Sequence, residues 1–136
     1  MQRLEWSEAL ALGQPVMDAD HEAAVAEINA MGDAVVTAPD QLAQLLGGFL
    51  DHSAAHFARE EELMQRYGFP AYPMHLREHQ RVLAELESVI ARLAAGETAA
   101  VHAYVREALP AWLVQHLHTM DAVTAAFIQR AAQAAG

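Results

Sequence analysis

The sequence contains no cysteine and no lysine, and each absence excludes a class of function. Without cysteine there are no disulfides, thiolate zinc sites or cysteine nucleophiles, and thiol usage does not indicate the redox compartment. The basic residues are 8 arginines against 18 acidic residues, so the formal net charge is -10. Such a charge repels nucleic-acid phosphates and anionic lipid, and we therefore expect neither nucleic acid nor a membrane as a partner.

The sequence also lacks a long hydrophobic run. A membrane-spanning helix needs about 18 or more apolar residues, and no segment approaches that length. The opening residues, MQRLEWSEAL, are interrupted by Glu5 and Glu8, which is not the pattern of an export signal. We therefore expect a cytoplasmic protein. The 136 residues, 54% of them hydrophobic, fit a single domain with one core over residues 1–136.

Apolar residues recur at steps of three and four, the spacing of amphipathic helices. Four segments show this pattern, at about residues 21–37, 39–68, 75–96 and 101–127. Asp18 and Asp20 precede the first segment and are suitable N-cap residues. The last segment contains Pro110, whose missing backbone donor predicts a kink with helix on both sides.

No segment alternates with a period of two over the length of a strand, and there is no internal repeat or linker. Four long amphipathic helices with short connections predict an all-α fold. We expect an antiparallel up-down-up-down four-helix bundle, preceded by an irregular N-terminal arm that extends through Met17.

Several polar residues lie on the apolar faces of these helices, where a bundle has its interior. They are His21, His56, Glu60, His75, His79 and His116. Burying an imidazole or a carboxylate costs several kcal/mol unless the group is hydrogen-bonded, paired or bound to a metal. One inward histidine is usually a satisfied core residue. A group of this size is different, because mutual hydrogen bonding among imidazoles leaves lone pairs without donors.

The spacing of these residues indicates a metal site. Residues four apart on a helix are rotated by only about 40°, so both can bind one ion. Two pairs have this spacing, His56 with Glu60 and His75 with His79.

Asp121 follows His116 by five residues, which is about 140° further round an ideal helix. Either Asp121 reaches across to a bridging position between two metals, or the helix is locally distorted. Imidazole-rich ligands without thiolate suit iron, zinc, copper or nickel better than calcium or magnesium. Seven candidate ligands are too many for one tetrahedral zinc and about right for two metals that share carboxylate bridges.

Four stretches of the sequence resemble the signature segments of the hemerythrins, specifically the single-domain bacteriohemerythrins. They are DADH with Asn29 eight residues after its histidine, HFAREEELM, YGFPAYPMHLREH and WLVQHLHTMD. The resemblance extends from Trp6 to about Phe127. It implies reversible binding of O2 at a non-haem diiron centre, for oxygen storage, delivery or sensing, by a protein that is not an enzyme.

The resemblance also implies a role for each candidate ligand. One iron would have three histidine ligands, His75, His79 and His116. The second iron would have two, His21 and His56, and O2 would bind at its open position. The two ions would be bridged by an oxo or hydroxo group and by two carboxylates, Glu60 and Asp121.

By the same resemblance, four residues would cover the O2 site and exclude water, although ordinary core packing explains them too. They are Phe57, Trp112, Leu113 and Leu117. The chain departs from the family at Ala24, because many relatives have a large aliphatic residue three positions after the first histidine. Ala24 therefore predicts a roomier or wetter pocket and faster autoxidation.

Two other functions are compatible with the same ligands. A diiron enzyme could reduce peroxide or nitric oxide at the open iron, which Ala24 mildly favours, but the predicted inner faces offer no acid or base beside the pocket. A structural zinc bundle is the other alternative. His52 makes a second HxxxH pair with His56 and is an alternative ligand. A protein partner cannot be identified from the sequence.

Overall fold

The computed structural model describes residues 3–135, and within this range the regular structure is entirely helical. Three long helices match the first three predicted segments: α1 (Pro15–Thr37), α2 (Leu42–Arg66) and α3 (Tyr72–Ala94). A short 3-10 turn, η1 (Pro39–Gln41), precedes α2. The last segment is divided into α4 (Thr98–Ala103), η2 (Tyr104–Ala108), α5 (Leu109–His116), η3 (Leu117–Asp121) and α6 (Ala122–Ala135).

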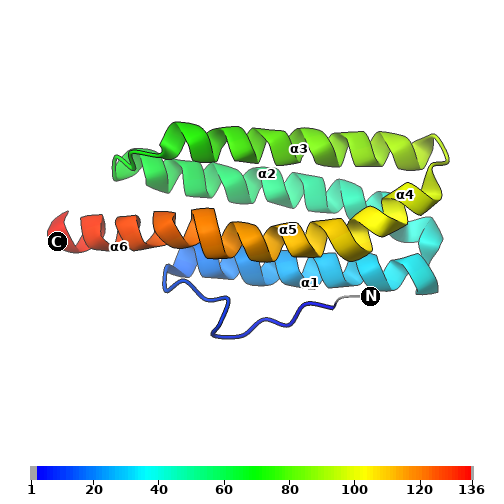
Figure 1. The fold of residues 1–136 in the computed structure, drawn as a ribbon, viewed down its shortest axis with the longest axis horizontal. Coiled ribbons are helices and arrows are strands. Elements are labelled where there is room, and N and C mark those ends of the chain that lie inside the picture. The colour runs from blue at the N-terminus through cyan, green and yellow to red at the C-terminus, as the bar shows by residue number, and fades with distance from the viewer. Residues whose placement is uncertain (1–2, 136) are drawn as a thin grey trace.

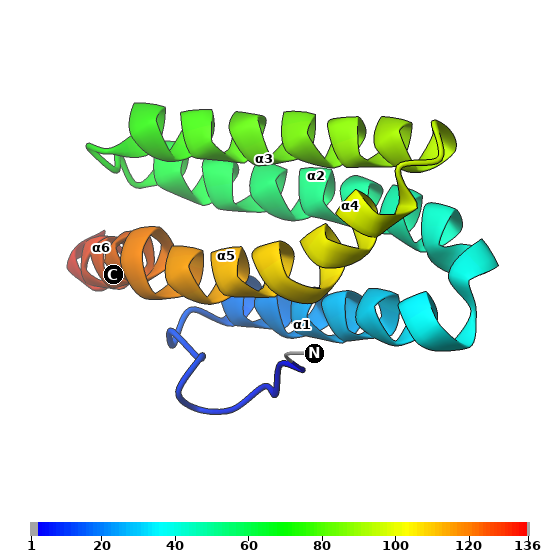
Figure 2. The ribbon, with the colours of Figure 1, turned by 45° about the vertical axis from the view of Figure 1, so that its right-hand side comes forward.

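The helices run alternately in opposite directions along one long axis (Figure 1). Helix α2 packs against both α3 and α1, and the continuous stretch from α4 to α6 runs alongside α1 (Figure 2). The predicted antiparallel four-helix bundle is therefore confirmed. No helix within residues 3–135 has the length and apolar character needed to cross a membrane.

The start of α1 differs from the prediction. The helix begins at Pro15, whose fixed φ suits a first helical position, and the Gln14 side chain accepts a hydrogen bond from the Met17 amide. The prediction that Asp18 or Asp20 is the N-cap was wrong. Asp18 lies in the first turn, and its carboxylate instead accepts hydrogen bonds from the amides of the preceding arm. The arm therefore ends at Gln14 and not at Met17.

The N-terminal arm is attached to the bundle by specific contacts. The Asn29 side chain accepts a hydrogen bond from the Leu4 amide at 2.9 Å and donates one to the Leu4 carbonyl at 2.7 Å. Leu10 is buried in the main apolar cluster. Further along the arm, Gly13 has a φ of 79°, and a Cβ there would lie 2.8 Å from the Gln129 side chain. Glycine is therefore the residue that this turn accommodates.

The region around Pro110 is helical on both sides, as predicted. Pro110 lies in the first turn of α5, and the π-helical segment η2 immediately precedes that helix. The Leu109 amide donates to the carbonyl of Tyr104, five residues earlier. The wider turn is the local adjustment at the position where proline cannot donate a backbone hydrogen bond.

The buried apolar side chains form two clusters at different levels of the bundle. The larger one includes Leu46, Leu86 and Leu109, and the smaller one consists of Met17, Leu63, Ala125 and Ile128. Buried polar residues lie between them along the helices, for example Glu60 on α2. This polar level of the bundle is the candidate functional site.

Candidate metal centre

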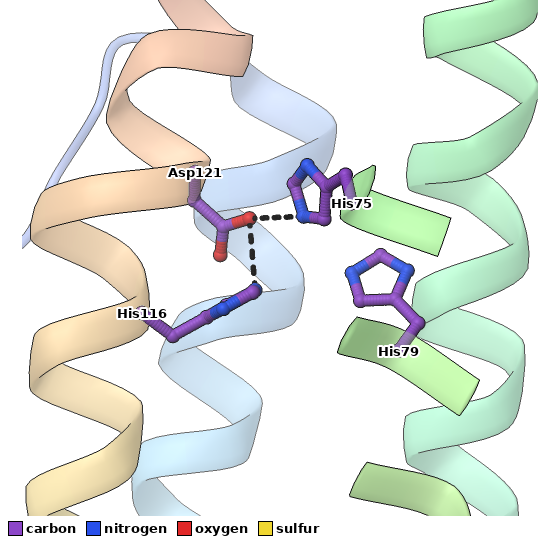
Figure 3. A group of neighbouring side chains, drawn as sticks. All are labelled: His75, His79, His116 and Asp121. Carbon is purple, nitrogen blue, oxygen red and sulfur yellow. Dashed lines mark ion pairs between the residues drawn. The ribbon is translucent and has the colours of Figure 1, made fainter. Parts of the chain in front are cut away.

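All seven predicted ligands are buried in this polar level. The exposed fraction of each whole residue is at most 7%. They fall into two groups in which one donor atom per residue lies within 4.8 Å of the others. The first group is His75, His79, His116 and Asp121, and the second is His21, His56 and Glu60. Figure 3 shows the first group, with the Asp121 carboxylate directed towards the histidines of α3 and α5.

The Glu60 carboxylate lies between the two groups. Its Oε2 atom is 2.9 Å from Nε2 of His21 and 2.7 Å from Nε2 of His56. Its Oε1 atom is directed to the other group and lies 3.2 Å from Nε2 of His79. One carboxylate oxygen of Glu60 therefore faces His21 and His56, and the other faces the group that contains His79.

The Asp121 carboxylate is shared in the same way. Its Oδ2 atom lies 3.1 Å from Nε2 of His21. Its Oδ1 atom lies 3.0 Å from Nε2 of His75 and 3.3 Å from Nε2 of His116 (Figure 3). Five imidazole nitrogens and two shared carboxylates thus converge on one small volume.

The segment η3 explains how His116 and Asp121 reach the same site. It is π-helical, and the amide after it donates to the carbonyl of Leu117, five residues earlier. In a π-helical turn, residues five apart lie nearly one above the other, whereas an α-helix separates them by about 140°. Both alternatives left open by the sequence are therefore present, because Asp121 lies between the groups and the helix is distorted.

The buried charges of the centre stabilise one another. Burial disfavours the charged form of His21, but hydrogen bonds and charge interactions with Asp121 and Glu60 outweigh it and raise its pKa to about 9. Burial acts to raise the pKa of each carboxyl group, yet favourable interactions with the surrounding histidines hold both the Glu60 pKa and the Asp121 pKa below their ordinary values. Without metal, these interactions favour two ionised carboxylates together with a protonated His21.

Two histidines have partners on the far side of the ring. Nδ1 of His79 donates to Glu61 at 2.9 Å, and Nδ1 of His75 donates to the Thr124 hydroxyl at 2.9 Å. The Thr124 hydroxyl already donates to the carbonyl of Met120, so it can only accept from His75. These contacts place the hydrogen on Nδ1 and leave Nε2 of each ring with a lone pair directed into the centre.

The seven residues fit a metal centre on the chemistry of their unpaired atoms. Among residues 3–135, five atoms that point into the centre are buried without a hydrogen-bond partner: Glu60 Oε1, Asp121 Oδ1 and Nε2 of His75, His79 and His116. Unpaired buried acceptors are costly, and cations at this position would bind them. Nδ1 of His21 is also buried without a hydrogen-bond partner.

Comparison with known proteins identifies the family. The family model described as "Hemerythrin HHE cation binding domain" matches residues 12–128. The chain belongs to the hemerythrin family. It is 38% identical over 118 residues to a bacteriohemerythrin from Ralstonia nicotianae, covering 87% of this chain and 83% of the relative. It is 30% identical over 116 residues to a bacteriohemerythrin from Aquifex aeolicus, covering 84% and 88%. A myohemerythrin from Sipunculus nudus is 35% identical over 72 residues, 53% of each chain.

Hemerythrins bind a non-haem diiron centre, and the two groups of donors in this chain suit that centre. The predicted pocket residues adjoin it. Phe57 stacks on His79, with ring centroids 3.9 Å apart, and Trp112 stacks on His116 at 4.7 Å. Leu113 and Leu117 are buried nearby in the main apolar cluster, as is Ala24. Their role around O2 stays a prediction.

At three residues of the site, the structure differs from the sequence prediction or adds to it. His52 is not with the ligands, because its side chain is 70% exposed and its Nδ1 lies 2.7 Å from the Glu27 carboxylate. The roles of Glu61 and Thr124 as partners of the histidines were not predicted from the sequence. The position of Glu61 next to Glu60, at the border between the inner and outer faces of α2, could have indicated that it lies near the ligands.

Proposed function

We propose that this chain binds O2 reversibly at a diiron centre held by its seven buried polar side chains. The ligands are His21, His56, Glu60, His75, His79, His116 and Asp121. The supporting observation is that Glu60 and Asp121 each present one oxygen to each group of histidines, the arrangement needed to bridge two ions. When bound, the two ferrous ions supply the two electrons that O2 accepts on binding and returns on release.

The unequal division of histidines determines where O2 binds. Three imidazoles surround one position and two surround the other, and each position also faces one oxygen of Glu60 and one of Asp121. The second position, beside His21 and His56, therefore has room for an external ligand. This unequal division supports a carrier of small ligands over a structural zinc site, in which the coordination shell is closed.

The residues around the ligands keep them in position and keep water out. Glu61 and Thr124 fix the tautomers of His79 and His75, so no proton has to move before these rings bind metal. Phe57 and Trp112 lie against His79 and His116 and limit rotation of those rings. Leu117 is fully buried and contributes to a dry cover that prevents side reactions of bound O2.

We propose an oxygen carrier, store or sensor and not an enzyme. The titratable groups next to the centre are already engaged, for example Glu61 with His79 and Glu78 with Arg81 and the Trp112 indole. Reduction of peroxide or nitric oxide would need a proton donor beside the open position. Steady-state turnover of peroxide should therefore be negligible, and rapid turnover would contradict this part of the proposal. We also propose, on the sequence expectations, a single domain over residues 1–136 and a cytoplasmic location.

The direct test is an optical spectrum of the iron-loaded protein, reduced without oxygen and then exposed to air. We expect a visible absorption band that appears with air and fades under vacuum over repeated cycles. Metal analysis of the same sample should give two irons per chain, and a zinc-loaded sample is the control. A band that does not depend on oxygen, or a stably bound zinc in place of iron, would overturn the proposal.

A further inference from the structure

A cleft between α1 and α2 opens to solvent beside His56. Its volume is about 220 Å³. The buried residues at its base include Ala24, Ser53 and His56, and the exposed residues at its mouth include Ala23 and Ala55. The cleft exists because three alanines occupy positions where larger side chains would fill the space between the helices.

An ion pair and a histidine–carboxylate hydrogen bond join α1 to α2 at the two ends of this cleft. Arg59 donates two hydrogen bonds to Asp20, at 2.8 and 2.7 Å, and Nδ1 of His52 lies 2.7 Å from Glu27. The paired residues are seven apart on each helix, and the helices are antiparallel, so the pairs are two turns from one another. They brace the helices on either side of the alanines and keep the cleft from closing.

The cleft reaches the centre at its most accessible ligand. The His56 side chain is 9% exposed, whereas the other six ligand side chains are at most 3% exposed. His56 belongs to the group with two histidines, where an external ligand has room to bind.

Two other surface hollows touch ligands, but on the opposite side of the centre. An apolar hollow of about 190 Å³ reaches His75, and a polar hollow of about 310 Å³ reaches His116. Both histidines belong to the group that already has three imidazoles. Of these three hollows, the cleft between α1 and α2 is therefore the one that approaches the open position.

We propose that this cleft is the entry port for small polar ligands, water and small anions among them, that exchange at the open metal position. The proposal rests on the function proposed above. The walls suit such ligands because the buried polar residue Ser53 lies at the base and the polar or charged residues Asp20, Glu27, His52 and Arg59 line the cleft. An ion can stay partly hydrated along such a path, which an apolar tunnel would not allow.

Narrowing the mouth tests the port without changing a ligand. Ala55→Leu and Ala23→Leu place a larger side chain at exposed helical positions of the mouth, and leucine is a good helix former. Ala54→Leu is the matched control, because Ala54 is exposed on the same helix but does not line the cleft. The probe is azide, mixed rapidly with the oxidised, iron-loaded protein and followed by its absorption.

A port affects entry and exit equally. In both mouth variants we expect the azide association and dissociation rates to fall together, by about tenfold, while the Kd stays unchanged because neither end state is altered. The control should behave like the wild-type protein. Wild-type rates in both mouth variants would overturn the port, and so would an altered Kd with an unchanged association rate.

The same samples separate the two proposals. Iron content and circular dichroism establish that each variant is folded and loaded, and the oxygen-dependent spectrum is recorded in parallel. If the azide rates respond as expected but no reversible oxygen band appears, the port stands and the carrier function fails. If the oxygen band is present and reversible but the azide rates do not respond, the carrier function stands and the port fails.

Discussion

Glu61 accepts a hydrogen bond from Nδ1 of His79 at 2.9 Å, although the two residues lie on different helices. The Glu61 side chain is 23% exposed, whereas the His79 side chain is fully buried. A carboxylate at the edge of the bundle thus orients an imidazole at its centre. Such a partner makes the ring a stronger metal ligand, because it stabilises the positive charge that the bound ring acquires.

Glu61→Ala should therefore weaken metal binding. Loss of a partner of this kind typically costs about 10- to 100-fold in metal affinity. Glu61→Gln retains a neutral acceptor and should show a smaller loss. Competition for iron between the protein and a chelator measures the affinity. The control is Glu62→Ala, which removes a neighbouring carboxylate that pairs with Arg66 at the surface. Equal affinities for Glu61→Ala and Glu62→Ala would contradict the prediction.

The free energy of unfolding of the metal-free protein should fall when the pH is raised and also when it is lowered from an intermediate optimum. The pKa of His21 is raised to about 9, so protonated His21 stabilises the fold below about pH 6.5, and this contribution is lost as the pH rises to 9. The lowered pKa values of Glu60 and Asp121 have the opposite sign, because their contribution is present above about pH 4 and is lost on acidification.

Urea unfolding of chelator-treated protein from acidic to alkaline pH measures this dependence. We expect the highest free energy of unfolding between about pH 5 and 6.5. With iron bound, the alkaline decrease should disappear, since a metal on Nε2 of His21 replaces the proton. Metal uptake at pH 7 should therefore release a proton. A metal-free protein with constant stability between pH 6.5 and 9 would show that His21 is not protonated as inferred.

Ala24→Leu should slow the autoxidation of the oxygenated protein. Ala24 lies at the base of the cleft between α1 and α2, together with His56. A leucine there would exclude water from the open side of the centre, and an added barrier of about 1.4 kcal/mol corresponds to a tenfold slower decay. The decay of the oxygen-dependent absorption band measures the rate. Ala26→Leu, at an exposed position of α1, is the control. An unchanged decay rate would rule out this role for Ala24.

Asn29→Ala should detach the N-terminal arm and destabilise the fold. The substitution removes both hydrogen bonds to the Leu4 backbone, and we expect a loss of about 1–3 kcal/mol in the free energy of unfolding. Asp33→Ala is a useful comparison, since it removes only the exposed ion pair with Arg3, which should contribute less than about 1 kcal/mol. Urea unfolding of the iron-loaded variants gives both values. A larger effect for Asp33→Ala would show that the ion pair, and not Asn29, holds the arm.

The helical faces and the buried polar residues could be predicted from the sequence because both depend on local periodicity. The spacing of His56 and Glu60 on one helix, and of His75 and His79 on another, determines which face they share. Their assembly between helices follows from the bundle itself. The proximity of the five histidines and Glu60 was therefore predictable from periodicity, whereas the position of Asp121 depends on the π-helical segment η3.

The features that the sequence did not reveal depend on the exact relation between neighbouring segments. Asp18 is a good capping residue by type, but Pro15 starts the helix earlier, and Asp18 binds the amides of the arm instead. Glu61 resembles any solvated glutamate until α3 is placed beside it. The sequence pattern of one helix does not determine where the neighbouring helix lies. Hydrogen bonds between side chains of different helices were therefore not predicted.

The π-helical turn between His116 and Asp121 has a consequence for protein design. A designer who transfers this centre to an ideal bundle would use regular α-helices, in which a carboxylate five residues after a histidine points to a different side. The transfer would have to keep the extra residue in that turn or move the carboxylate one position closer along the chain. Copying the seven side chains without this irregularity would leave the centre with one bridge.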